Sequence, residues 1–413
     1  MKINIIGAGI SGLIAAKVLE ENGCKTTIIE ATNRPGGRVK TDIVDGFQLD
    51  HGFQVLLSEY PTAKKHLDYA ELELQSFGSG AVIFTNGKQK IIGDPLRDLS
   101  LLFPTIFSGI GNLVDKFKIL KLNSKLKSKN LNDIFETPEK TTKQYLQDFG
   151  FSGDIISKFF TPFFTGIFLE TELATSSRMF EFVFKMFAEG KALMPKQGIE
   201  SIPKQIASNL KYTTFQFNEK VKSITSNIIT LESGKKIESD YTIIAGDIEA
   251  MINGKKTTPV HWKSCTNIYF TCRKKLHSKP LIGLVADQNS LVNNIFYHNS
   301  LQTSQKGKGE LLSVTIVKQH KLSSKALISV VQDELKTLCG LSDLTYLKMY
   351  YIPKALPQLT NLAYTKQPET TQLDKSIFIA GDTQLNGSLN AAMLSGELAA
   401  KAVLAEINKN RSS

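Results

Sequence analysis

Three glycines near the N-terminus have the spacing of a loop that holds a pyrophosphate. Gly7, Gly9 and Gly12 lie between an apolar run at 2–6 and a helical pattern at about 11–22. Gly7 allows the sharp turn out of the strand, Gly9 lets a phosphate approach the backbone, and Gly12 lets the helix pack on the strand. The helix N-terminus presents N–H groups and the positive end of its dipole to the phosphates. This segment therefore predicts a strand, a turn and a helix that bind a dinucleotide.

An acid and an arginine downstream narrow the choice of dinucleotide. Residues 26–29 form a second predicted strand, and Glu30 follows at its carboxyl end, eighteen residues after Gly12. A carboxylate there accepts hydrogen bonds from both ribose hydroxyls and repels a 2′-phosphate, which favours FAD or NAD over NADP. The Gly-Gly-Arg sequence at 36–38 then places backbone amides and a forked cation within reach of the pyrophosphate and of a flavin. This arrangement favours FAD.

The C-terminal end of the chain provides a matching second half. A short apolar strand is expected at 376–380, followed by Gly381 and Asp382 and by a helix at about 390–406. An acid at the end of a strand can hold ribityl hydroxyls. Small residues on the helix allow close approach to a flat ring or to a neighbouring helix. The N-terminus of this helix would then stabilise negative charge on a reduced flavin. The alternative interpretation is an ordinary C-terminal helix that follows an ordinary turn.

Together these segments resemble the flavin-containing amine oxidase superfamily, which includes amine oxidases, protoporphyrinogen oxidases and phytoene desaturases. The resemblance rests on residues 7–12, Glu30, 36–38, 379–382 and 388–396, and extends to 194–199, Val221 and 240–245. In that family, the last three segments touch the isoalloxazine ring, place a valine on the adenine and supply a strand of the FAD domain, respectively. Residues 160–166 and 355–357 resemble the desaturase and protoporphyrinogen oxidase branch more than the amine oxidase branch.

The resemblance implies an α/β fold with a Rossmann-like FAD-binding domain, discontinuous in sequence, and an α+β substrate domain. We assign 1–75, 191–256 and 353–413 to the FAD-binding domain and 76–190 and 257–352 to the substrate domain. The first insert is expected to be mostly helical, and the second contains strand-like runs at 267–270, 281–285 and 311–317. The predicted FAD-binding residues are Gly7, Ala8, Gly9, Ser11, Gly12, Glu30, Ala31, Gly36, Gly37, Arg38, Val221, Gly381, Asp382, Asn390 and Ala391.

Length and composition agree with this assignment. A chain of 413 residues exceeds what one hydrophobic core usually holds, so two domains are expected. The four cysteines have neither zinc-site nor disulfide-framework spacing, and we predict no metal site. The chain opens directly into a strand without the pattern of a secretory signal, and no apolar run approaches the ~18 residues of a membrane span. We therefore expect a cytoplasmic protein.

Nine phenylalanines occur within 159–187, at positions 159, 160, 163, 164, 168, 180, 182, 184 and 187. One interpretation is an apolar tunnel for a flat or extended substrate. The other is plain helix core, because an aromatic stripe at helical spacing normally packs. As a group, they favour an apolar small-molecule substrate.

The reaction expected of such a protein is removal of hydride from an apolar substrate to flavin N5, as in a desaturase or a porphyrinogen oxidase. The catalytic side chains are unknown; Lys196 and His51 are candidates near the ring, although a surface lysine and a strand-end histidine explain them more simply. The alternatives are a flavin amine oxidase and a non-catalytic prenyl carrier on the same scaffold. Glu30, Arg38 and Asp382 favour an enzyme, because a carrier gains nothing from ribose and ribityl ligands.

Positive charge is concentrated after the first apolar stretch of the helical insert. The chain carries a formal net charge of +11, and six lysines at 116, 118, 121, 125, 127 and 129 follow the apolar residues 99–107. This region could contact the surface of an anionic bilayer as a peripheral membrane segment. A lysine-rich face that is simply solvated explains the same pattern equally well. Nucleic acid is not expected as a partner, because the chain contains no recognised nucleic-acid-binding module.

Overall fold

A six-stranded sheet carries the glycine loop. In this computed structural model, which describes residues 1–94, 97–246, 260–273, 275–277 and 279–412, the first five strands of that sheet are parallel and the last is antiparallel. Their order is β10 (Thr214–Gln216), β2 (Thr26–Ile29), β1 (Ile3–Ile6), β14 (Tyr241–Ile244), β21 (Ile377–Ile379) and β20 (Gln372–Asp374). The strands expected at 2–6, 26–29, 240–245 and 376–380 are confirmed. The chain adds β2 on one side of β1 and later adds β14 and β21 on the other side. Ligands of parallel sheets bind beside the carboxyl ends of the strands at the point where the order of strands reverses in this way.

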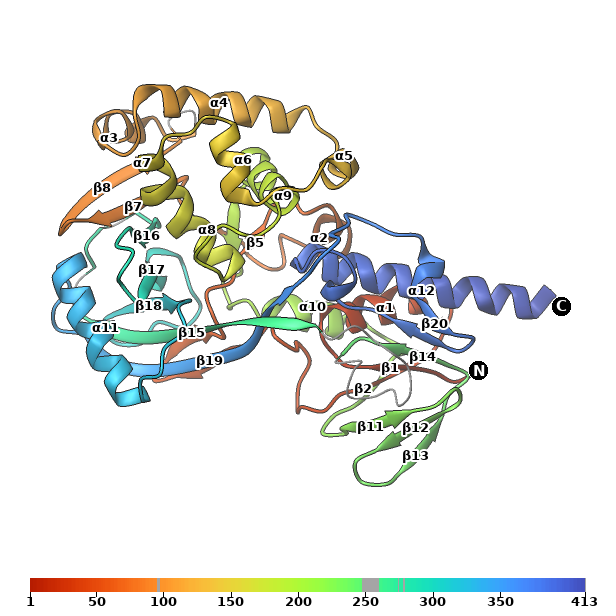
Figure 1. The fold of residues 1–413 in the computed structure, drawn as a ribbon. Coiled ribbons are helices and arrows are strands. Elements are labelled where there is room, and N and C mark those ends of the chain that lie inside the picture. The colour runs from red at the N-terminus through yellow and green to blue at the C-terminus, as the bar shows by residue number, and fades with distance from the viewer. Residues whose placement is uncertain (95–96, 247–259, 274, 278, 413) are drawn as a thin grey trace.

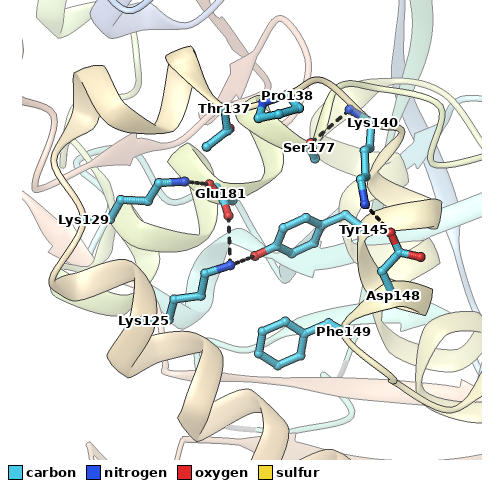
Figure 2. Close-up of a pocket in the computed structure, with 10 residues that line it drawn as sticks. All are labelled: Lys125, Lys129, Thr137, Pro138, Lys140, Tyr145, Asp148, Phe149, Ser177 and Glu181. Atoms are coloured by element: carbon cyan, nitrogen blue, oxygen red, sulfur yellow. Dashed lines mark hydrogen bonds and ion pairs between the residues drawn. The ribbon is translucent and has the colours of Figure 1, made fainter.

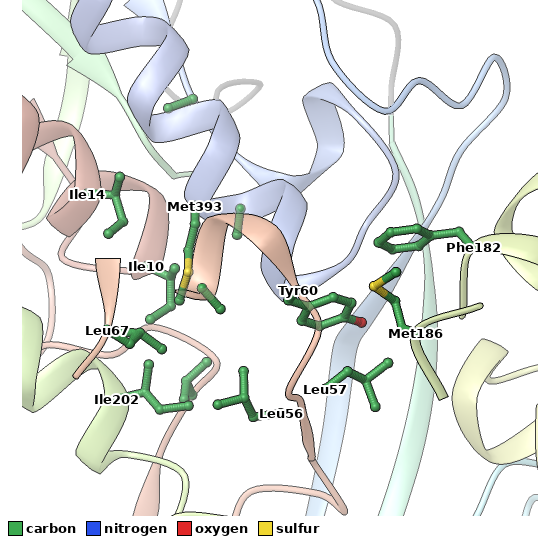
Figure 3. Packing of buried hydrophobic residues seen from close by; sticks show 14 of the residues in the cluster. Ile10, Ile14, Leu56, Leu57, Tyr60, Leu67, Phe182, Met186, Ile202 and Met393 are labelled. Carbon is green, nitrogen blue, oxygen red and sulfur yellow. The ribbon is translucent and has the colours of Figure 1, made fainter. Parts of the chain in front are cut away.

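Two helices pack against each other beside this sheet, as the small residues of the last helix predict. They are α1 (Ile10–Glu21) and α12 (Leu389–Ser412). A Cβ on Gly396 would lie 2.2 Å from the backbone oxygen of Ser11, so the two backbones are in direct contact there. Ile10, Ile14 and Met393 belong to one continuous core with residues that flank α2 (Pro61–His66) and residues of α9 (Ser177–Glu189) and α10 (Ser201–Ser208). Figure 3 labels Tyr60, Leu67, Phe182, Met186 and Ile202 among them.

Smaller antiparallel sheets surround the parallel one. The strands β11 (Val221–Ile224), β12 (Ile228–Leu231) and β13 (Lys236–Glu238) form a meander whose apolar side packs on Ile6, Ile29 and Ile244. The strands β3 (Thr41–Val44) and β4 (Phe47–Asp50) form a two-stranded hairpin. A separate three-stranded sheet has the order β5 (Leu56–Leu57), β9 (Ala192–Met194) and β6 (Gln75–Ser76).

The second large sheet has seven strands and is mostly antiparallel. Its order is β19 (Thr345–Gln358), β15 (His261–Cys272), β18 (Glu310–Ile316), β17 (Val292–Tyr297), β16 (Ile282–Val285), β7 (Gly80–Thr85) and β8 (Lys88–Gly93). The strand-like runs at 267–270, 281–285 and 311–317 are confirmed as parts of β15, β16 and β18. Figure 1 shows β15 and β19 running from this sheet into the middle of the molecule, and the domain boundary predicted at 353 falls inside β19.

The β7–β8 hairpin departs from the expectation that 76–190 is mostly helical. It joins the seven-stranded sheet because β7 pairs in parallel with β16, two hundred residues later in the chain. Residues 81–84 of β7 are buried on both faces and so lack the alternation of apolar and polar residues that marks a half-exposed strand.

The two faces of the seven-stranded sheet differ in chemistry. Helix α11 (Ser324–Cys339) packs on one face, where Ile268, Leu312 and Val314 contribute an apolar core. The opposite face approaches α8 (Thr161–Phe168), since Asn293 of β17 donates to the Pro162 carbonyl at 3.1 Å. This inner face carries buried polar side chains from three neighbouring strands: Asn267, Asn294, Ser313 and Thr315.

The remaining helices form the outer part of the insert. They are α3 (Leu102–Phe107), α4 (Leu113–Lys127), α5 (Leu131–Glu136), α6 (Thr142–Asp148) and α7 (Gly153–Ile155). Figure 1 shows α3, α4 and α5 along the outer edge at the top of the molecule, away from the parallel sheet. Throughout the part of the chain that the structure describes, no helix is both long and apolar enough to span a bilayer.

Candidate functional site

The glycine loop has the geometry of a ligand cradle at the carboxyl end of β1. Gly7 has a φ of +101°, and a Cβ on Gly12 would lie 2.0 Å from the Gly7 carbonyl oxygen, so both positions require glycine. Gly9 is different, because a Cβ there would meet no protein atom within 4 Å. The space beside Gly9 is therefore open to a ligand at the point where α1 begins. Ala8 and Ser11, the other two predicted residues of the loop, are buried beneath it.

Glu30 is buried at the end of β2 and is bonded to the glycine loop. One carboxylate oxygen accepts the Ala8 N–H at 2.7 Å, and the other accepts both the N–H and the hydroxyl of Thr32 at 2.8 Å. These three bonds hold the carboxylate at the edge of the cradle, next to the exposed Ala31. The oxygen that accepts only one bond retains capacity for a ribose hydroxyl.

Val221 lies close to this acid through the chain that leads into β11. The Glu219 N–H donates to the Glu30 carbonyl at 2.9 Å, two residues before Val221. The Val221 side chain itself is buried in the apolar core between the meander and the parallel sheet. Its predicted contact with adenine stays a prediction.

Arg38 and Asp382 meet although 344 residues separate them in the sequence. The guanidinium donates to the Asp382 carboxylate at 2.6 Å and lies 5.1 Å from the centre of the Trp262 ring. Gly36 and Gly37 bring Arg38 to the loop, since the Gly36 N–H donates to the Ala8 carbonyl at 2.9 Å and a Cβ on Gly37 would lie 3.2 Å from Gly9 Cα. The predicted FAD-binding residues Arg38 and Asp382 therefore form an ion pair beside the glycine loop.

Trp262 was not singled out in the sequence. It is the only tryptophan of the chain and lies near the start of β15, where its ring faces the guanidinium of Arg38. The feature of the sequence that could have identified this residue is a single large aromatic side chain next to a lysine at the start of a strand.

The first turn of α12 is positioned by its own polar side chains. Ser388 accepts the Ala391 N–H at 3.0 Å and so caps the helix. Asn390 is fully buried and accepts the Thr62 N–H at 2.8 Å, which ties α12 to the start of α2. Gly381, with a φ of +147°, donates its N–H to Ser395 at 2.8 Å. Asn390 and Ala391 therefore have structural contacts, and their binding of FAD stays a prediction.

The two candidate catalytic side chains are both engaged with neighbours. The ammonium of Lys196 forms an ion pair with Glu73 at 2.6 Å. The imidazole of His51 lies 2.8 Å from Asp42 and stacks on Tyr350 with ring centres 4.3 Å apart. Burial opposes ionisation of Asp42, but hydrogen bonds from Arg34, His51 and Tyr350 outweigh it and lower its pKa to about 2. These contacts agree with the simpler explanation of both residues as structural.

Asp50, immediately before His51, is a buried carboxyl against the segment 195–199. One of its oxygens accepts the Thr41 hydroxyl at 2.6 Å and the Ile199 N–H at 3.1 Å. Burial raises the pKa of Asp50 to about 6 despite these two bonds, with the charge of Glu200 acting in the same direction. A carboxyl whose pKa is raised on folding favours the native state at low pH and disfavours it once ionised.

We therefore expect Asp50→Asn to change how stability depends on pH. The folded pKa lies about two units above the unfolded value, so the wild type loses about 3 kcal/mol of unfolding free energy from this group as the pH rises from below 4 to above 6. Asparagine keeps an accepting oxygen for Thr41 and Ile199 and does not ionise, so that loss should disappear. Urea unfolding of both proteins from pH 4 to pH 8 measures it; an equal pH slope in the two would show that Asp50 is not a buried titrating group.

An open loop at a helix N-terminus, an acid at the end of each of two parallel strands and an arginine between them fit a flavin dinucleotide and are typical of FAD-dependent oxidoreductases. The model of the flavin-containing amine oxidoreductase family matches residues 10–404, and the chain belongs to that family. FAD is its cofactor. The prenyl carrier considered above is set aside, because the family is one of oxidoreductases.

Curated relatives include L-amino-acid oxidases of snakes. The L-amino acid oxidase Bs29 of Bothriechis schlegelii is 24% identical over 97% of this chain and 89% of its own length. The match to BmooLAAO-I of Bothrops moojeni is 25% identical and covers 66% of this chain but only 60% of that protein.

Solved structures share the fold over nearly the whole chain. A putative protoporphyrinogen oxidase from Exiguobacterium sp. 255-15 superimposes with a TM-score of 0.71 at 16% identity, covering 98% of this chain and 99% of its own. Putrescine oxidase bound to putrescine gives 0.70 at 15% identity over the same shares. At these identities, the likeness concerns the fold alone.

Proposed function

We propose that this oxidoreductase removes hydride from an apolar substrate, in a reaction of the desaturase or porphyrinogen oxidase type. The bound flavin supplies the two-electron acceptor, and the substrate loses one hydride and one proton to form a double bond. The chain's own residues bind and orient the substrate and exclude water from it.

The observation that carries this proposal is an incompletely buried aromatic face on the helices that cover the seven-stranded sheet. Five of the nine phenylalanines, at 160, 164, 168, 180 and 182, are fully buried and form helix core. Phe159, Phe163, Phe184 and Phe187 remain half-buried. Two ring contacts link three of them, since Phe163 lies 5.6 Å from Phe159 and 5.4 Å from Phe187. Half-buried aromatic rings in contact with one another suit an apolar ligand.

The inner face of the sheet supports the same substrate class. Asn267, Asn294 and Thr315 present neutral amide and hydroxyl groups there, and burial lowers the pKa of His298 to about 4, which keeps its ring neutral. Neutral groups suit a substrate without charge, because a buried ammonium or carboxylate requires an opposite charge as partner. Two buried nitrogen atoms, Nδ2 of Asn267 and Nε2 of His298, make no hydrogen bond within the described part of the chain. Both can therefore form a hydrogen bond with a polar group of the substrate.

Oxidation of an amino acid is the second candidate, and one residue favours it. Lys263 of β15 is half-buried and donates to the Phe168 carbonyl at 2.9 Å and to the Thr175 hydroxyl at 3.1 Å. Burial lowers the pKa of Lys263 and the charge of Glu170 opposes that shift. Both hydrogen bonds of the ammonium go to neutral oxygens, so we infer that it can also bind a substrate carboxylate. The relatives named as L-amino-acid oxidases agree with this candidate.

An anaerobic screen of flavin bleaching distinguishes the two. We expect a polyene or a porphyrinogen to reduce the FAD absorbance near its visible maximum, while amines and amino acids leave it unchanged. Phe187→Ala should weaken binding of the active compound about tenfold or more, because a buried aromatic ring contributes about 1.5–3 kcal/mol. Phe149→Ala, which alters a half-buried phenylalanine directly after the outer helix α6, should not. Bleaching by amino acids alone, lost in Lys263→Met, would replace our proposal with the second candidate.

A further inference from the structure

Large apolar side chains lie exposed on the outer helices of the insert. Of thirteen large hydrophobic residues exposed among those the structure describes, seven fall between Leu102 and Leu120: Leu102, Ile106, Phe107, Leu113, Val114, Phe117 and Leu120. Phe117 is 71% exposed and Leu113 is 60% exposed. So dense a group of exposed apolar side chains in nineteen residues marks an interaction surface.

Helical geometry gathers the α4 members of this group into one stripe. Leu113, Phe117 and Leu120 stand at positions i, i+4 and i+7 and so share a face, while Leu122 and Leu126 on the opposite face are buried in the insert. α4 is thus anchored on one side and presents an apolar stripe to the outside on the other. Figure 1 shows this helix and α3 at the outer edge of the molecule.

Lysines border the stripe on both sides. Lys121 and Lys127 are exposed, and the helical period places them on opposite flanks of the stripe. Lys116 and Lys118 are half-buried and donate to the carbonyls of Ile106 and Gly150, and the charge of Asp115 offsets part of theirs. These four lysines supply positive charge around an apolar centre.

The other two lysines of the cluster are directed elsewhere. Figure 2 shows Lys125 and Lys129 turned toward Glu181, whose buried carboxylate lies 2.6 Å from the ammonium of Lys129 and 3.7 Å from that of Lys125. They line a small groove of about 330 Å³ that also holds the ion pair of Lys140 with Asp148. Glu181 compensates one of their two charges and holds both side chains toward the groove, so four lysines, not six, border the stripe.

Acidic residues are nearly missing from this part of the sequence. Residues 99–132 contain one acid, Asp115. Its side chain is fully buried and accepts hydrogen bonds from Asn112 and Ser152, where it caps α4. The outward surface of α4 therefore combines an apolar centre with an excess of positive charge, since one buried carboxylate faces four lysines.

We propose that the stripe of Leu113, Phe117 and Leu120, with the exposed Val114 beside it and its bordering lysines, docks the protein on the surface of an anionic lipid bilayer. Apolar side chains would enter the headgroup boundary while the lysines contact acidic headgroups from either side. A second copy of this chain is a poor occupant, because a twofold contact would bring the two sets of lysines together. The inference goes beyond the proposed reaction and does not depend on it.

Co-sedimentation of the FAD-loaded protein with vesicles tests this docking. We expect the protein to sediment with vesicles of equal parts phosphatidylserine and phosphatidylcholine at low salt, to remain in solution with phosphatidylcholine alone, and to dissociate as salt is added. The double variant Leu113→Gln, Phe117→Gln should bind about a hundredfold more weakly, at about tenfold for each side chain. Lys121→Gln with Lys127→Gln should lose about fivefold for each charge.

Matched controls separate this surface from general effects. Tyr212→Gln with Leu322→Gln removes two exposed apolar side chains elsewhere, and Lys222→Gln with Lys236→Gln removes two exposed lysines from the meander. Both should bind vesicles like the wild type, and all variants should keep full FAD content. Wild type that stays in solution with the anionic vesicles, α4 variants that bind as well as the controls, or a dimer in gel filtration that only the Leu113, Phe117 variant dissolves would each overturn the proposal.

Discussion

Replacing Gly9 by alanine is expected to leave the apoprotein folded and to weaken FAD binding about tenfold to a hundredfold. The new Cβ meets no protein atom within 4 Å, and the backbone of Gly9, with φ −71° and ψ 174°, accepts any residue. The methyl group would instead occupy the space that a pyrophosphate needs, and an inserted methyl in a close contact costs about 1–3 kcal/mol. Thermal unfolding of the apoprotein and titration with FAD measure the two effects separately.

Two other glycines provide the matched comparison. Gly153→Ala also adds a Cβ that meets nothing within 4 Å, but it lies at the start of α7, far from the loop, and should change neither stability nor FAD affinity. Gly12→Ala should destabilise the apoprotein itself, since its Cβ would lie 2.0 Å from a backbone oxygen. If Gly9→Ala binds FAD as tightly as Gly153→Ala does, the cofactor does not approach the loop at Gly9.

The second large effect is expected from Glu30→Ala, which should weaken FAD binding by about 2–5 kcal/mol. The substitution removes the carboxylate that we predict to accept ribose hydroxyl protons, and bonds to a charged group are about twice as strong as neutral ones. It also leaves the Ala8 and Thr32 N–H groups without their present acceptor, so the apoprotein should lose stability as well. Flavin content after dialysis and equilibrium unfolding report the two losses.

Glu30→Gln separates the two roles of this carboxylate. Glutamine keeps one accepting oxygen for the loop but loses the charge, so stability should recover more than FAD affinity does. Asp382→Ala is expected to release flavin from the other end of the cradle, where it also removes the ion pair with Arg38. Retention of flavin by Glu30→Ala, or loss of folding in Asp382→Ala with FAD affinity unchanged, would show that the acid in question serves the fold only.

The N-terminal unit could be predicted because its determinants are local. Gly7 and Gly12 are required by a turn and by a helix that touches its own loop, so their spacing alone predicts strand, turn and helix. The acid at the end of β2 follows for the same reason, since the carboxyl ends of neighbouring parallel strands share one edge. The parallel strands β14 and β21 were likewise marked by short apolar runs before small or acidic residues.

Partners distant in the sequence could not be predicted, because periodicity shows that a residue is buried but not what it packs against. The ring of Trp262 over Arg38, the burial that raises the pKa of Asp50 and the pairing of β7 with β16 all join segments more than a hundred residues apart. The same holds within the aromatic and basic clusters of the insert. Their sequence spacing is uniform, yet tertiary contacts divided the phenylalanines into buried core and a half-buried face, and turned Lys125 and Lys129 toward Glu181. Local patterns therefore determined the cofactor cradle, and the tertiary structure decided which side chains remain available for a substrate or a surface.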